Sequence, residues 1–85
     1  MRSLDIHGLY KTEAQIEVEL FLKESFEHRQ YFVLIIHGFG KDVLRELTHN
    51  ICSSSKYVEK FEYAPPNIGG AGATMVYLKK KGVNA

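Results

Sequence analysis

The stretch YFVLIIHGFGKDVL, residues 31–44, decides how the chain is organised. Its first six residues are apolar without alternation and rich in β-branched and aromatic types, as in a central strand covered on both faces. The apolar run ends in the tetrapeptide HGFG, and Asp42 then provides an N-cap for a helix. The stretch therefore predicts a strand over 31–36 that turns directly into a helix, with an ionisable imidazole at the turn.

Upstream of this strand, residues 13–28 follow the pattern of an amphipathic helix. Its predicted apolar stripe consists of Ala14, Val18, Leu22 and Phe26, widened by Ile16, Leu20 and Phe21. Thr12 is the expected N-cap, and Gln15 completes a capping box with it. The opposite face carries four glutamates, Glu13, Glu17, Glu24 and Glu27. Because this helix is acidic, it is a poor candidate for contact with phosphate.

Three further strands complete the predicted sheet. SLDIH, residues 3–7, alternates apolar and polar side chains and stops at Gly8, which predicts a short strand with one buried face. YVEKFEY (57–63) and TMVYLK (74–79) are the other two. The segment APPNIGGAGA (64–73) between them is expected to be a loop, because its prolines and glycines suit neither a helix nor a ladder.

The predicted elements follow the order strand, helix, strand, helix, strand, strand. The second helix ends at SSSK (53–56), and its apolar face carries Leu44, Leu47, Thr48 and Ile51. The two crossovers predict parallel neighbours with right-handed connections, whereas the relative direction of the last two strands stays open. The sequence thus predicts one α/β domain, a two-layer sandwich of about four strands and two helices, with 79–85 as a frayed tail.

Composition limits the classes of function. The net charge is +1, so overall charge cannot drive binding to nucleic acid or to a membrane surface. The longest apolar run is too short to span a bilayer, and the first twenty residues lack the pattern of a secretion signal. The single cysteine, Cys52, excludes an internal disulfide framework and is expected in the core. These features predict a cytoplasmic protein with no membrane partner.

Candidate functional residues gather at two strand ends. Asp5, His7 and Gly8 end the first strand, and the HGFG tetrapeptide (37–40) ends the second. Because ligands bind at the carboxyl ends of parallel strands, we expect both loops to open on the same edge of the sheet. The two imidazoles and the Asp5 carboxylate would then be neighbours.

These residue types suit the cleavage of a phosphodiester. Histidine gives or takes a proton near neutral pH, glycine lets the backbone approach an anion, and a helix N-terminus adds a favourable dipole. Lys41 and Arg45 in the first turns of the second helix add positive charge for a phosphate. In RNA the 2′-hydroxyl can serve as the nucleophile without a metal ion. Alternatively, Asp5 holds a divalent ion such as Mg²⁺ or Mn²⁺ instead of orienting an imidazole.

Simpler interpretations stand beside these. A histidine at a strand end is commonly a hydrogen-bonded structural residue, and glycines commonly serve turns. GGAGAT (69–74) is either a flexible connection or a phosphate loop that lacks the Lys-Ser/Thr ending of a P-loop. His28 and His49 are expected as bystanders on or near exposed helix faces, and KKK (79–81) as a solvated end of the chain.

Three motifs stand in order along the chain: LDIHGL at 4–9, IIHGFG at 35–40 and GGAGATMVYL at 69–78. In spacing and order they resemble the Smr domain, the small MutS-related module, over nearly the whole chain. The resemblance implies a single Smr domain over 1–85 with a βαβαββ fold and a four-stranded mixed sheet, similar to the C-terminal domain of the third bacterial translation initiation factor. Such domains stand alone or at the C-terminus of second-type MutS proteins, so an upstream domain is an expected partner.

The resemblance also implies an endonuclease that nicks DNA or cleaves RNA. Asp5 and His7 match the first motif and are the expected catalytic residues, with His37 as a further candidate for proton transfer. The expected substrate-binding residues are Gly8, Gly38, Phe39, Gly40, Lys41, Arg45, Gly70, Gly72 and Thr74. Many family members carry a basic residue at the place of Phe39. Its ring either stacks on a base or only packs, and the contact with phosphate is weaker by one charge.

Two other functions remain open at this point. A domain without catalytic activity would bind branched DNA, structured RNA or the ribosome and deliver an attached domain there. A protein-interaction domain would use its glycine loops to contact a partner protein.

Overall fold

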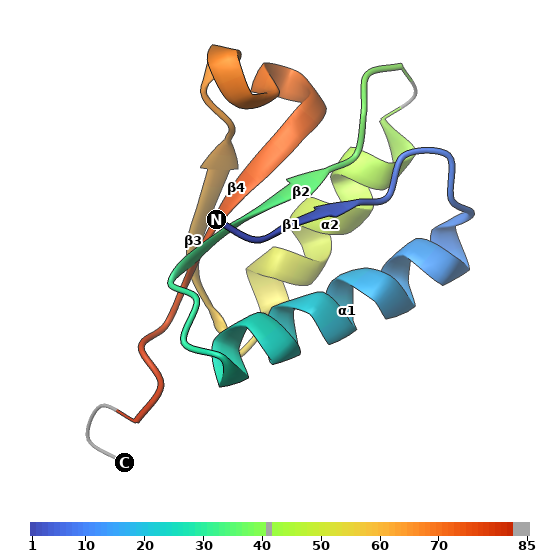
Figure 1. Ribbon diagram of the computed structural model, residues 1–85. Coiled ribbons are helices and arrows are strands. Elements are labelled where there is room, and N and C mark those ends of the chain that lie inside the picture. Colours follow the sequence, from blue (N-terminus) through green and yellow to red (C-terminus); the bar gives the residue numbers. More distant parts are fainter. Residues whose placement is uncertain (41, 83–85) are drawn as a thin grey trace.

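The computed structural model describes residues 1–40 and 42–82 and shows one four-stranded sheet with two helices (Figure 1). The strands are β1 (Ser3–Asp5), β2 (Phe32–Ile36), β3 (Val58–Tyr63) and β4 (Ala73–Leu78). The helices are α1 (Lys11–Glu27) and α2 (Val43–Ser54), with two short 3₁₀ helices, η1 (Pro66–Ile68) and η2 (Gly70–Gly72), between β3 and β4. The predicted α/β class and element order are confirmed. Residues 64–73 were predicted to be a loop without helix. This is wrong in one respect, because the segment contains the two single-turn 3₁₀ helices η1 and η2.

The strand order in the sheet is β1-β2-β4-β3. β1 and β2 pair in parallel, as the first crossover predicts, and β4 runs antiparallel to both β2 and β3. The second crossover does not join neighbours, because β4 inserts between β2 and β3. Residues 73–76 of β4 are all buried, whereas most of β3 is exposed. The strand with two apolar faces therefore takes the inner position, and the charged strand forms the edge.

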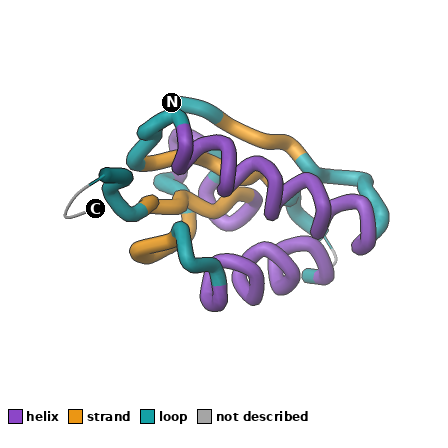
Figure 2. Tube along the Cα trace, turned by 90° about the horizontal axis from the view of Figure 1, so that it is seen from below, coloured by secondary structure: helices purple, strands orange, loops and turns teal. Residues whose placement is uncertain are grey.

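The two helices lie side by side and cover one face of the sheet (Figure 2). The core between the layers contains buried side chains from both helices, from β2, β3 and β4, and from Ile6 just after β1. Its most deeply buried members include Ile6, Val18, Leu22, Val33, Ile35 and Val76. On the opposite face, Leu34 of β2 and Met75 of β4 pack with Ala64, Ala73 and the half-buried Ile68 of η1. β2 is thus covered on both faces, as predicted, but on the second face a turn segment replaces a helix.

Helix α1 starts earlier than predicted. Tyr10, not Thr12, is its N-cap, and the Tyr10 amide donates to the Glu13 carboxylate (3.3 Å). The buried face is centred on Ala14 and Val18, so Ile16, which lies two residues from each, points to solvent. Leu20 is exposed for the same reason, and the predicted widening of the stripe by these two residues is wrong.

The chain beyond β4 stays attached to the domain as far as residue 81. The Lys79 amide donates to the Tyr57 carbonyl (2.9 Å), and Lys81 Nζ pairs with Glu27 Oε2 (2.5 Å). Residues 79–81 therefore do not behave as the predicted frayed tail, while 83–85 lie outside the described residues. Cys52 is buried as expected, and burial raises the pKa of its thiol to about 12. Within the described part of the chain, no helix has the length and apolarity needed to cross a membrane.

Candidate functional site

The carboxyl ends of β1 and β2 bring the two His-Gly turns together, at the end of the sheet where both strands lead into helices (Figure 1). A Cβ atom built on Gly38 would lie 3.3 Å from the His7 Cβ atom. Gly38 has a φ of +83°, a conformation that glycine adopts without strain. The close approach of the two loops therefore requires glycine at this position.

A groove of about 640 Å³ opens between these loops. Its described lining residues are His7, Gly8, Leu9, Tyr10, Lys11, His37, Gly38, Phe39, Val43 and Leu44. The predicted juxtaposition of the two imidazoles on one side of the molecule is therefore present. Tyr10 and Lys11 were not among the predicted site residues, although they directly follow the first motif and form the N-cap and the first residue of α1.

Asp5 and His7 form a hydrogen-bonded pair at the edge of the groove. Asp5 Oδ1 lies 2.6 Å from His7 Nδ1 and also accepts the His7 amide at 3.0 Å. These hydrogen bonds from the His7 ring and amide lower the pKa of the Asp5 carboxyl, which stays ionised at neutral pH. A carboxylate only accepts, so Nδ1 carries the proton here and Nε2 is the nitrogen left for exchange with a ligand. The His7 side chain is 70% exposed, so this ring is open to solvent.

His37 lies in a different environment from His7, because only 5% of its surface is exposed. Its Nδ1 is 3.3 Å from the Gly38 carbonyl, and its Nε2 is 2.9 Å from Thr74 Oγ1. Burial is the main cause that lowers the pKa of this imidazole, and the neighbouring His49 and Arg45 lower it further. The neutral ring is therefore the stable form in the folded protein.

His49 of α2 shares the Thr74 hydroxyl with His37, since His49 Nε2 also lies 2.9 Å from Thr74 Oγ1. The Gly38 carbonyl only accepts, so a neutral His37 carries its proton on Nδ1 and has a bare Nε2. The Thr74 hydroxyl must then donate to His37 and accept from His49. The result is a directional chain of hydrogen bonds from α2 through β4 to the glycine turn.

The expectation that His49 is a bystander is wrong. Its ring packs against Phe61 and Tyr63 of β3, with centroid separations of 5.1 and 5.6 Å. Burial lowers the pKa of His49 as well, and Arg45 contributes. His49 directly follows the buried Thr48 and lies beside the buried face of α2, and the sequence pattern alone gives no signal of its contact with Thr74.

The third motif (69–78) contacts the second motif (35–40) through hydrogen bonds and packing. The Gly72 carbonyl accepts the amides of His37 (3.1 Å) and Gly38 (2.8 Å), and the Phe39 ring lies over Gly72. A Cβ on residue 72 would come within 2.8 Å of that ring, so a larger residue here would displace the exposed Phe39 ring from its place. Gly70 donates its amide to the Pro65 carbonyl (3.0 Å) within the 3₁₀ turns. These glycines serve close packing of the turn, and neither they nor Thr74 line the groove.

Of the remaining predicted residues, Gly8 lines the groove, whereas Gly40 and Arg45 do not. Gly8 and Gly40 have positive φ values of +81° and +111° and form the turns. Asp42 is the N-cap of α2, as predicted, but its side chain makes no cap hydrogen bond and instead pairs with Arg45 (2.8 Å). Arg45 does not line the groove, and Lys41 lies outside the described residues.

Among residues 1–40 and 42–82, no three His, Cys, Asp or Glu side chains gather in the manner of a metal site. Asp5, the predicted ligand, uses Oδ1 to bind His7. A divalent ion at this position would therefore rely on the remaining Asp5 oxygen, water and substrate phosphate, which is a coordination that Mg²⁺ accepts.

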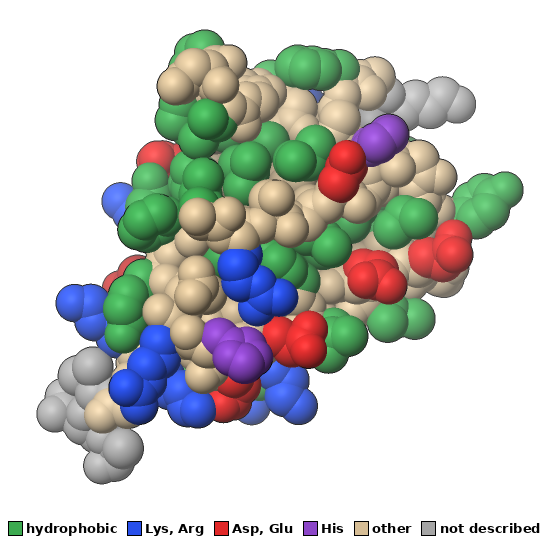
Figure 3. All heavy atoms as spheres, in the orientation of Figure 1, with side chains coloured by type: hydrophobic (Ala, Val, Ile, Leu, Met, Phe, Trp, Pro, Cys, Tyr) green, Lys and Arg blue, Asp and Glu red, His purple; other side chains and the backbone are tan. Residues whose placement is uncertain are grey.

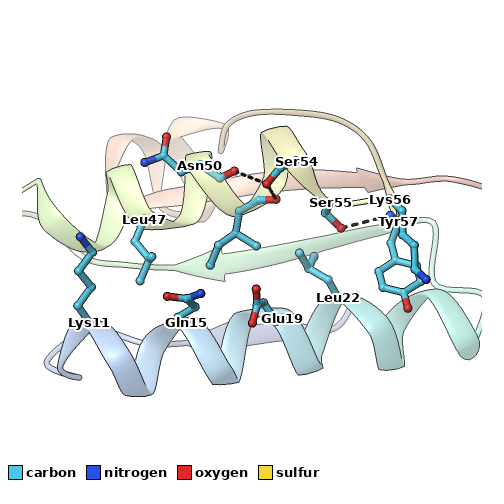
Figure 4. A pocket seen from close by; sticks show the side chains of 11 residues that line it. Lys11, Gln15, Glu19, Leu22, Leu47, Asn50, Ser54, Ser55, Lys56 and Tyr57 are labelled. Carbon is cyan, nitrogen blue, oxygen red and sulfur yellow. Dashed lines mark hydrogen bonds between the residues drawn. The ribbon is translucent and has the colours of Figure 1, made fainter.

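A second hollow, of about 490 Å³, lies between the two helices (Figure 4). Figure 4 shows Gln15 and Glu19 of α1 pointing toward α2 and Leu47 of α2 pointing toward α1, and Leu22, Asn50 and Ser54 also line the hollow. The Ser54 hydroxyl donates to the Asn50 carbonyl (3.1 Å), so it is not activated as a nucleophile. This cleft contains no paired acid and base, and the groove beside His7 remains the candidate site.

Positive charge is unevenly spread over the face shown in Figure 3. Lys and Arg side chains gather toward the end of α1 and the chain beyond β4. At the opposite end, where β1 and β2 turn into helices, this face shows mainly acidic, histidine and hydrophobic side chains. Any contact with phosphate at the groove therefore depends on a few local groups.

A two-layer βαβαββ domain with these motifs at its strand ends defines a known class. The family model of the Smr domain matches residues 4–79, and the chain belongs to this family. The Smr domain of Thermus thermophilus MutS2 superposes with a TM-score of 0.89 at 34% identity, over 93% of this chain and 99% of that one. YdaL, a stand-alone small MutS-related protein from Escherichia coli, gives 0.88 at 27% identity, over 92% of this chain and 64% of that one.

The curated relatives are much longer proteins. Endonuclease MutS2 of Streptococcus pneumoniae is 40% identical over 76 residues, and Endonuclease MutS2 of Lactococcus lactis is 33% identical over 76 residues. Each match covers 89% of this chain and 10% of the relative. The chain thus spans about a tenth of the length of these nucleases.

Proposed function

We propose that this domain cleaves phosphodiester bonds in nucleic acid, with His7 as the proton-transfer group. The observation that carries the proposal is the Asp5–His7 pair, a 2.6 Å contact beside a groove. An imidazole held at Nδ1 by a carboxylate and exposed at Nε2 is the arrangement by which enzymes orient a general base. The name of the MutS2 relatives, endonuclease, agrees with this chemistry.

The chemistry follows from the pair. His7 Nε2 takes the proton from the attacking oxygen, which is the 2′-hydroxyl in RNA or a water molecule in DNA. That oxygen forms a bond to phosphorus while the P–O bond to the leaving sugar oxygen breaks, and the leaving oxygen takes up a proton from water. Asp5 stabilises the imidazolium that results, and Lys11 lies at the groove to balance the charge that develops on the phosphate. The start of α1 at Lys11 adds its positive dipole end to the same place.

The proposal assigns His37 to positioning instead of direct proton transfer. Both of its ring nitrogens are engaged, by Gly38 and by Thr74, and the ring is buried. Its function is to fix the glycine turn that approaches His7. Asp5 retains an optional role as ligand of Mg²⁺ or Mn²⁺, since one of its oxygens faces away from His7.

The decisive experiment compares wild type, His7→Ala and His28→Ala on labelled single-stranded and branched DNA and on RNA. His28 is the matched control, because it is an exposed histidine at the other end of α1, about 25 Å along the helix. Wild type and His28→Ala are expected to cleave at the same rate, and His7→Ala to lose about 100-fold or more. Cleavage by His7→Ala at the wild-type rate would overturn the assignment.

The same assay separates the two nucleophiles and tests for a metal ion. Cleavage of RNA that persists in EDTA and leaves a cyclic phosphate indicates attack by the 2′-oxygen. Cleavage that requires added Mg²⁺ or Mn²⁺ places a divalent ion in the site, with Asp5→Asn as the variant that should weaken its effect.

A second candidate function is binding without cleavage, in which the domain brings the rest of a longer protein to nucleic acid. The observation that favours it is the burial of His37, which leaves His7 as the one solvent-exposed imidazole among the described lining residues. Gel shifts of DNA or RNA without any cleavage by the wild-type chain would establish this alternative.

A further inference from the structure

Two exposed aromatic side chains, Tyr10 and Phe39, line the same groove as His7. Tyr10 and Phe39 are each 80% exposed, and both line the same hollow as His7. They come from different loops, Tyr10 from the β1–α1 connection and Phe39 from the β2–α2 connection. Large aromatic surfaces are usually withdrawn from water, so two of them at one groove indicate a surface that a ligand covers.

The Phe39 ring is fixed on one side by packing against the backbone. It lies over Gly72, whose missing side chain leaves the room, and the remainder of the ring is open to solvent. The turn beneath it is fixed by the hydrogen bonds of the His37 and Gly38 amides to the Gly72 carbonyl. A ring that is supported on one side and exposed on the other is a platform for a second flat group.

The charges around the groove favour stacking over phosphate contacts as the source of affinity. Lys11 is the cation among the described lining residues, and Arg45 on the rim is paired with Asp42. The chain as a whole carries a net charge of +1. Proteins that bind single strands obtain affinity from bases stacked on aromatic rings, and this term does not depend on excess positive charge.

We propose that Phe39 and Tyr10 stack on unpaired bases that flank the phosphate presented to His7, so that the substrate is a single-stranded or unpaired segment of nucleic acid. The position of the cleaved phosphate rests on the proposed function above, but the stacking itself is a binding property. A continuous duplex does not satisfy the site, because its base faces are covered by the neighbouring pairs.

The test uses the His7→Ala background, in which the ligand stays intact, and reads binding by 2-aminopurine fluorescence in single-stranded DNA and RNA oligonucleotides and in matched duplexes. Quenching on addition of protein reports stacking. Phe39→Leu and Tyr10→Leu are each expected to weaken single-strand binding about fivefold or more and to remove part of the quenching. Phe39→Trp is expected to keep binding. The DNA and RNA arms show which strand the site takes.

Phe32→Leu is the matched control, because Phe32 is 53% exposed at the opposite end of β2. Unchanged affinity of Phe39→Leu and Tyr10→Leu, with melting temperatures near wild type, would overturn the proposal, as would equal binding of duplex and single strand. Absence of quenching by the His7→Ala protein with Phe39 and Tyr10 intact, together with normal cleavage by wild type, would overturn the stacking alone. Quenching without any cleavage by wild type would overturn the proposed function and leave the stacking in place.

Discussion

The two His-Gly turns of this domain share a dipeptide and a place after a parallel strand, yet they lie in opposite environments. The His7 side chain is 70% exposed and touches one carboxylate, whereas His37 is 5% exposed and hydrogen-bonded through both ring nitrogens. β1 is an edge strand, so within the described residues no further strand lies on its outer side. β2 is an inner strand, and the segment that leads into β4 covers its turn.

This difference teaches that the position of a strand in the sheet decides what its terminal residue can do. The turn after the edge strand β1 exposes the His7 imidazole to solvent. The turn after the inner strand β2 holds the glycine loop that lies against His7. The predictions that follow test this division, from the largest expected effect to the smallest.

Replacing Asp5 by Asn is expected to reduce cleavage about 100-fold with little change in melting temperature. The amide of Asn does not stabilise an imidazolium and can bind the wrong tautomer of His7. Single-turnover cleavage rates of the variant and wild type measure the effect. A rate within twofold of wild type would show that His7 needs no orienting carboxylate.

Replacing His37 by Ala is expected to lower the free energy of unfolding by about 2–3 kcal/mol, because it opens a cavity and removes the acceptor of the Thr74 hydroxyl, which keeps only its hydrogen bond with His49. For a domain of this size the melting temperature falls by about 10 °C or more. Urea denaturation measures the change. The same substitution at His7 is expected to leave stability nearly unchanged, and equal losses at both positions would remove the distinction between the turns.

Acidification is expected to weaken the fold through the buried histidine pair. Burial lowers the pKa of His37 and of His49 below the ordinary value of 6.5, so the unfolded chain binds more protons than the folded one. The contribution of these two histidines to the free energy of unfolding is therefore fully present above about pH 6.5. It is lost as the pH falls through their folded-state pKa values. The hydrogen bonds from His7 lower the pKa of the Asp5 carboxyl below its ordinary value of 3.8, so its contribution to stability is lost only at still lower pH.

Urea unfolding between about pH 7.5 and about pH 5 measures this slope. His49→Gln keeps an amide N–H for Thr74 but does not titrate, so its slope is expected to be shallower than that of wild type. Identical slopes in the two proteins would contradict a role of the pair in acid sensitivity.

The smallest effects are expected from the turn glycines. Gly8→Ala and Gly38→Ala both place a side chain at positive φ and cost about 1 kcal/mol each. Only Gly38→Ala also meets the His7 Cβ atom, so it should reduce cleavage as well, whereas Gly8→Ala has open space around it. Chemical denaturation and cleavage rates of the two variants, measured together, separate backbone strain from displacement of His7.

Much of the fold follows from local patterns in the sequence. The uninterrupted apolar run predicts β2, the spacing of Ala14, Val18 and Leu22 predicts α1, and the right-handed crossover predicts that β1 lies parallel to β2. The meeting of the two His-Gly turns follows from that pairing alone. The third motif enters the prediction only through the family resemblance. Its spacing in the sequence does not by itself indicate contact with the other two motifs.

The insertion of β4 and the burial of His37 could not be predicted in this way. Both depend on which strand pairs with β2 from the far side, and that choice is made by tertiary packing of the whole sheet. The role of His49 was missed for the same reason, because its partner Thr74 reaches it only when β4 lies between β2 and β3. The exposure of Ile16 is different, since helix geometry alone predicts it once Ala14 and Val18 fix the buried face.

The inner position of β4 also affects how the domain folds during translation. β4 is the last strand to leave the ribosome, and both β2 and β3 need it as a hydrogen-bonding neighbour. A nascent chain that ends before residue 73 can form helices and the β1–β2 pair, but it exposes the apolar edge of β2. Such a chain is a target for chaperones or for aggregation until the final strand arrives and closes the sheet in one cooperative step.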